Sequence, residues 1–344
     1  MINKFIFIIF SIILTLLFSY NQKKKNVILS QVFFVLLILF LSLIFTFRDI
    51  IFPTDVGTDY YEYKNWFELI SFNNLKFNFQ NIGFNTLISI VKIFTNNYYI
   101  FLFICGFLIN YLIIKFILEN TEDMLFSSII YYCLMFFLTF NVLRQWIACA
   151  IFVFAFKYLK KHDFVKYTLA ILIGASFHDT AIILLLLYPI LLSKKMNFYR
   201  EEILSILITF FSFLNINFVI RLMDRICNIL GINYFHKYTL EYLESQSGNF
   251  TFLIISIILL ILINFKLFNS QKKANNYMVF IRYFLCLFPF AALSIKNGIF
   301  TRYLIYFEFA IIPAIDIIFS LFEAKSKMLL KISIIFILIL NFIL

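Results

Sequence analysis

The chain has 344 residues, of which 63% are hydrophobic and 14% are charged, and its mean hydropathy is +0.95. Such a composition excludes a water-soluble globular protein. The formal net charge is +11, but Lys, Asn, Ile and Phe are all abundant, as AT-rich codon usage alone would produce. The charge therefore does not indicate a nucleic-acid partner.

Continuous apolar runs predict an all-α polytopic membrane protein, because a barrel strand would show alternating hydrophobicity. A span needs about 20 residues, so the chain has room for about 12 transmembrane helices and none for a soluble catalytic domain. The predicted spans, in chain order, are 2–20, 27–47, 98–118, 124–142, 145–160, 164–177, 180–192, 203–219, 250–268, 277–295, 302–321 and 328–344.

Lysine clusters near span ends set the orientation, since such clusters favour the cytoplasmic side. These clusters lie at 23–25, 157–161, 194–195, 272–273 and 325–327. With them inside, both ends of the chain are predicted outside. The first run lacks a small-residue cleavage pattern and is followed by another apolar run, so we expect it to be a retained span.

Residues 1–344 are predicted to form a single integral membrane domain with two extracytoplasmic loops, at 48–97 and 220–249. The first loop is rich in aromatic and charged residues and is expected to hold interfacial helices. Its segment 82–95 carries Lys92 and would invert every later span if it crossed, so we place it along the outer interface.

The cysteines and the short motifs indicate neither a metal nor a cofactor. Five cysteines are scattered without a CxxC pair, which suggests neither a disulfide framework nor a zinc site. P-loop, GxGxxG and HExxH motifs are also absent from the sequence.

Ionisable residues gather at the outer ends of several predicted spans, which is typical of a shared wet site. Arg144 with Gln145, and Arg302, lie at two such ends, and the guanidinium fork suits a diphosphate. Lipid headgroup binding by a snorkelling arginine is the alternative for both. Arg48 precedes the motif Gly57-Thr58-Asp59-Tyr60.

Two residues could serve as an acid or base. His178 is one of three histidines and lies in a polar turn, where an imidazole could accept a proton from a hydroxyl. A hydrogen-bonded turn residue is the alternative. Asp59 could accept a proton or orient a hydroxyl, or it could cap a helix that begins at Tyr60. Arg221 and Arg225 could reach a substrate from the second loop, or belong to a charged surface.

In this order the motifs resemble the EpsG family, whose members are similar to the Wzy oligosaccharide repeat-unit polymerases. The resemblance covers about residues 47–312, and Thr180 stands where the family often has Ser. It rests on Arg48, Gly57-Thr58-Asp59-Tyr60, Gly83-Phe84-Asn85, Leu143-Arg144-Gln145-Trp146-Ile147-Ala148, Ser176-Phe177-His178 with Thr180-Ala181, and Arg302-Tyr303.

The resemblance implies a glycosyltransferase of the bacterial cell membrane that acts on polyprenyl-diphosphate-linked oligosaccharides at the extracytoplasmic face. It implies capsule, O-antigen or exopolysaccharide synthesis, with membrane lipid, a chain-length regulator and a flippase as further partners. The roles then expected are catalysis by His178 and Asp59, diphosphate binding by Arg144, Arg302 and Arg48, and substrate binding by Gly57, Tyr60, Gln145, Arg221 and Arg225.

A flippase for the same lipid-linked glycan is the competing hypothesis. A transporter should carry polar residues at mid-depth and a two-half repeat, whereas the polar residues here gather on one side. An O-acetyltransferase is a third alternative, but it would need a cytoplasmic route for its acyl donor.

Overall fold

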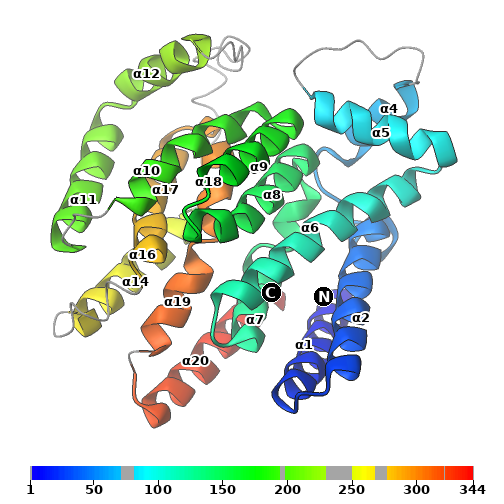
Figure 1. The fold of residues 1–344 in the computed structure, drawn as a ribbon, viewed down its shortest axis with the longest axis horizontal. Coiled ribbons are helices and arrows are strands. Elements are labelled where there is room, and N and C mark those ends of the chain that lie inside the picture. The colour runs from blue at the N-terminus through cyan, green and yellow to red at the C-terminus, as the bar shows by residue number, and fades with distance from the viewer. Residues whose placement is uncertain are drawn as a thin grey trace. The chain divides into compact units, whose positions relative to one another are not determined.

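A computed structural model describes residues 2–70, 81–193, 198–229, 250–267, 277–320 and 322–343. Every regular element in these ranges is a helix (Figure 1). The chain forms two compact units. Unit 1 comprises Met1–Phe156, Leu169–His178 and Phe322–Leu344, and unit 2 comprises Lys157–Thr168 and Asp179–Leu321.

Five helices among the described residues are long and apolar enough to cross a membrane: Ile2–Lys23, Val27–Thr46, Tyr98–Asn120, Met278–Lys296 and Ile299–Ser320. A bent pair of helices, Tyr199–Leu214 and Ile216–Arg225, brings the number to six if it counts as one span. These helices support the predicted class, a helical multi-pass membrane protein. The number twelve stays a prediction, because several other apolar helices in the described ranges have only 10–17 residues.

Unit 1 contains the N-terminal and C-terminal helices. Its elements are α1 (Ile2–Lys23), α2 (Val27–Thr46), α3 (Arg48–Ile51), α4 (Tyr60–Leu69), α5 (Ile82–Phe94), α6 (Tyr98–Asn120), α7 (Met124–Leu134), the 3-10 turn η2 (Phe137–Phe140), most of α8 (Leu143–Lys160), the end of α9 (Phe164–Phe177) and α20 (Ala324–Ile343).

Aromatic contacts and an ion pair join α1, α7, η2 and α20. The rings of Phe7 and Phe136 stack with centroids 4.7 Å apart, and Phe137 meets Phe342 of α20 at 5.2 Å. The Lys331 ammonium of α20 pairs with Asp123, whose side chain also caps α7. The predicted span 124–142 is therefore divided, since α7 ends at Leu134 and η2 follows.

The first predicted external loop contains α4 and α5, which pack on α6 through aromatic rings. Phe84 of α5 lies 5.6 Å from both Trp66 of α4 and Phe101 of α6, between ring centroids. Lys92 of α5 donates to the carbonyl of Glu68 at 3.1 Å. Lys92 thus satisfies the open carbonyl end of α4, and this local role explains a lysine in an apolar helix.

Unit 2 is built from η3 (Asp179–Leu186), α10 (Leu187–Leu192), α11 (Phe198–Leu214), α12 (Ile216–Ile229), α14 (Thr251–Leu267), α16 (Met278–Leu285), α17 (Leu287–Lys296), α18 (Ile299–Glu308) and α19 (Ile311–Ser320). α11 packs on α16 and α17, and α17 packs on α18 (Figure 1).

The structure corrects the predicted span 203–219. The chain turns through 98° at the break after Leu214, where the Asn215 side chain donates to the carbonyl of Phe211 at 3.1 Å. The following helix, α12, is amphipathic: Ile220 is buried, whereas Arg221 and Arg225 are exposed. A helix with one apolar face and one polar face suits the membrane–water interface better than the membrane core. Residues 230–249 of the second predicted loop lie outside the described residues.

Candidate functional site

Gly57 holds the loop between α3 and α4 against the turn that precedes α8. Its backbone φ is +99°, a value that residues with a side chain rarely adopt, and a Cβ there would overlap the carbonyl oxygen of Phe140. The next residue, Thr58, donates its backbone N–H to Oδ1 of Asn141 at 2.7 Å. The loop is thereby fixed three residues from Arg144.

Replacing Gly57 with alanine should destabilise unit 1, because the backbone strain costs about 1–3 kcal/mol and the methyl group overlaps Phe140. We expect a lower thermal midpoint for the purified protein, and weaker activity in step with it. Gly174→Ala is the matched control, since its Cβ would lie no closer than 3.4 Å to Ala148. A Gly57→Ala midpoint equal to that of the control would contradict this account.

Arg48 is fully buried at 0% exposure, which does not fit the predicted contact with a diphosphate. Its Nε donates to Val56 at 2.9 Å and its Nη1 to Phe45 at 2.7 Å, both through backbone carbonyls. The guanidinium also lies over the Phe45, Tyr60 and Phe140 rings. Burial lowers the pKa of Arg48. Arg48 is placed to hold the Gly57 loop, and its buried Nη2 has no hydrogen-bond partner among the described residues.

Asp59 and Tyr60 begin α4 and differ in exposure. Asp59 is half-buried and accepts a hydrogen bond from the Thr58 hydroxyl at 2.8 Å, but it makes no side-chain capping bond to α4. Tyr60 is buried at 2% exposure and donates to Oδ2 of Asp49 at 2.9 Å. Burial, together with this bond, raises the pKa of Tyr60. Asp59 can therefore meet a ligand, whereas Tyr60 supports the loop.

Asp49 is a residue that the sequence analysis did not select. Its Oδ2 also accepts from the Tyr99 hydroxyl at 2.8 Å, so one carboxylate joins α4 to α6. Its position directly after Arg48 was visible, but the two tyrosine partners were not. Asp49 fixes the start of α4, and with it the position of Asp59.

Arg144 lies at the start of α8 and is partly exposed. Its guanidinium carbon is 4.7 Å from the centroid of the Trp66 ring, and its Nη1 donates to Oδ1 of Asn81. Its Nε is buried and has no hydrogen-bond partner among the described residues. Unlike Arg48, Arg144 is partly exposed, so its guanidinium can meet an anionic ligand. Gln145, beside it, is fully buried, which does not fit the predicted substrate contact.

α5 and α9 come together next to Arg144. A Cβ on Gly83 would overlap the Ser176 hydroxyl and lie 3.0 Å from the Phe177 ring, so only a glycine allows this approach. His178 follows, 5% exposed, with its backbone N–H bonded to Gly174 at 3.1 Å. Gly174 in turn packs on Ala148 of α8.

These contacts bring five motifs of unit 1 together, although they are far apart in the sequence. Gly57 meets the Asn141 turn, Arg144 meets Asn81, and Gly83 meets Ser176. Sequence analysis missed Asn81, Asn141 and Trp66 as members of this cluster. Asn141 could have been noticed beside the Arg144 motif, and Trp66 as one of two tryptophans.

The other predicted site residues belong to unit 2. Arg302 lies on the first turn of α18, and α12 packs there through Ile220 against Phe300 and Tyr303. Arg221 and Arg225 are exposed on α12. The structure therefore places these three arginines on two packed helices.

In the described part of the chain, no group of three or more His, Cys, Asp or Glu could hold a metal ion.

The model of the EpsG family matches residues 31–344. The chain belongs to the EpsG family. The match extends beyond the range expected from the motifs and includes all of them. No curated protein and no solved structure matches the chain. This EpsG-family protein is a membrane protein of polysaccharide biosynthesis. Its family is associated with Wzy-like polymerases.

Proposed function

We propose that this EpsG-family protein polymerises a surface polysaccharide. It transfers a glycan from polyprenyl diphosphate to the terminal sugar of another lipid-linked repeat unit. The reaction takes place on the extracytoplasmic face of the bacterial cell membrane. The observation that carries the proposal is the partly exposed Arg144 guanidinium, which lies over the Trp66 ring and is held by Asn81.

Arg144 binds the diphosphate leaving group in this proposal. The guanidinium is anchored on one side by Asn81 and Trp66, so its remaining donors are fixed in direction before a ligand arrives. Preorganised donors stabilise charge that develops on a leaving group. Arg302 shares this role in the prediction from the sequence.

His178 and Asp59 divide the remaining chemistry. The nucleophilic sugar hydroxyl must lose a proton, and His178, at the end of α9, is the proposed base. Asp59 lies after the rigid Gly57 loop and orients the acceptor sugar. For Arg221 and Arg225, the glycan contact stays the prediction from the sequence. Arg48, Gly57 and Tyr60 act through the loop that they hold, and Gln145 acts through the packing of α8.

A gene deletion tests the function directly. We expect lipid-linked glycan of the deletion strain to consist of single repeat units on the outer face, detected by mass spectrometry, with long chains restored by the wild-type gene. Lipid-linked repeat units that fail to reach the outer face would instead indicate a flippase and contradict polymerisation.

A further inference from the structure

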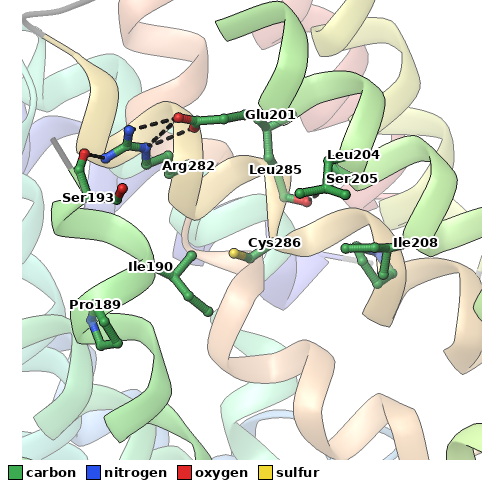
Figure 2. A pocket seen from close by; sticks show the side chains of 11 residues that line it. Pro189, Ile190, Ser193, Glu201, Leu204, Ser205, Ile208, Arg282, Leu285 and Cys286 are labelled. Carbon is green, nitrogen blue, oxygen red and sulfur yellow. Dashed lines mark hydrogen bonds and ion pairs between the residues drawn. The ribbon is translucent and has the colours of Figure 1, made fainter. Parts of the chain in front are cut away.

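Unit 2 contains an apolar groove of about 480 Å³, a volume typical of ligand pockets. Its walls come from α10, α11, α16 and α17, and Ile190, Leu204, Ile208 and Cys286 lie along it (Figure 2). The candidate site described above does not use any of these residues.

A buried ion pair closes one end of the groove. Nη2 of Arg282 lies 2.7 Å from Oε1 of Glu201, and Nε lies 2.8 Å from Oε2 (Figure 2). Nη1 donates to the carbonyl of Leu191 at 3.1 Å and to that of Ser193. The two charged side chains are 6% and 7% exposed. The pair thus joins α16 to α11 and to the end of α10. It stabilises the packing of the helices that line the groove and does not bind a charged group of a ligand.

The rim of the groove is exposed and apolar. Ile190, Leu204 and Ile208 are 49%, 48% and 46% exposed, and Met278–Lys296, which forms one wall, is a candidate span. Water does not fill an apolar groove stably, because it finds too few hydrogen-bond partners there. A hydrocarbon chain is therefore the occupant that suits this groove.

We propose that the groove binds the polyprenyl chain of the lipid-linked substrate, an inference that rests on the proposed function. The span Met278–Lys296 has 19 residues and is about 28 Å long at 1.5 Å per residue. Its Arg282 end is therefore on the opposite side of the membrane from Arg302, which follows its other end. A lipid with its diphosphate near Arg302 reaches the groove only with a chain longer than one leaflet, as a long polyprenyl chain is.

Photo-crosslinking in nanodiscs tests the groove with two exposed isoleucines of α11. Ile208 lines the groove and Ile206 does not, and both are 46% exposed. A photoactivatable polyprenyl phosphate should label α10, α11 or α16, and unlabelled polyprenyl phosphate should compete. Ile208→Trp should weaken binding about tenfold, the loss expected when about two CH₂ groups leave apolar surface. Ile206→Trp should bind like the wild type.

Equal binding by the two tryptophan variants would overturn the proposal. Labelling of the groove by a photoactivatable phospholipid and not by the polyprenyl probe would also overturn it. The assay involves no glycan transfer, so it is independent of the polymerase proposal. If the protein binds the probe but does not polymerise, the groove proposal stands and the proposed function fails. If the Ile208→Trp variant polymerises with an unchanged KM for the lipid-linked repeat unit, the proposed function stands and the groove proposal fails.

Discussion

Replacing Arg144 with lysine should reduce glycan polymerisation by about 10²–10³-fold, the usual loss when one preorganised donor to a reacting group is removed. The ammonium of lysine keeps the charge but lacks the planar fork that lies over Trp66, bonds Asn81 and offers a further donor in a fixed direction. The measurement is the rate of chain extension by purified protein in nanodiscs supplied with lipid-linked repeat units.

Two controls separate this effect from misfolding. Arg200 is an exposed arginine of α11, and Arg200→Lys should polymerise normally. Arg48→Lys should lower the thermal midpoint, because lysine cannot replace both carbonyl bonds of the buried guanidinium. Arg144→Lys should leave the midpoint close to that of the wild type. Wild-type chain length in the Arg144→Lys variant would refute the diphosphate role.

Replacing His178 with alanine should reduce polymerisation by about two or more orders of magnitude, the usual contribution of a general base. The protein should remain at normal abundance. Asp59→Asn should act through acceptor binding instead, since Asp59 is half-buried after a fixed loop. A higher acceptor concentration in the reconstituted assay should therefore partly restore its rate.

The opposite result would exchange the two roles. If His178→Ala keeps near-normal turnover and Asp59→Asn stays inactive at saturating acceptor, Asp59 is the base. His162→Ala is a suitable control, because His162 is an exposed histidine of the turn after α8 with no role in the proposed chemistry.

Hydrophobic patterning predicted much of the fold, because an apolar run of about 20 residues is a strong signal. α2 and α6 match their predicted ranges at the start and nearly so at the end. The break after Leu214 was missed, since Asn215 and Asn217 are two polar residues within an otherwise apolar stretch. The local bond from the Asn215 side chain to the carbonyl of Phe211 cannot be read from hydropathy.

The candidate site was predicted as residues, but not as contacts. The sequence selected Arg144, His178 and Asp59 by residue type and position. It did not identify Asn141, because its bond to Thr58 joins residues 83 positions apart. It also assigned ligand contacts to Arg48 and Tyr60, since charge and aromatic character give no measure of burial.

The right-angled join between α11 and α12 has a consequence for bilayers of different thickness. α12 presents Asn217, Arg221 and Arg225 outward at four-residue spacing, and its apolar side packs on the first turn of α18. Such a helix stays at the depth of the lipid headgroups, whereas a spanning helix changes its tilt when the bilayer thickness changes. Thinner or thicker lipid should thus change the tilt of α11 while Arg302 keeps its height relative to the phosphates.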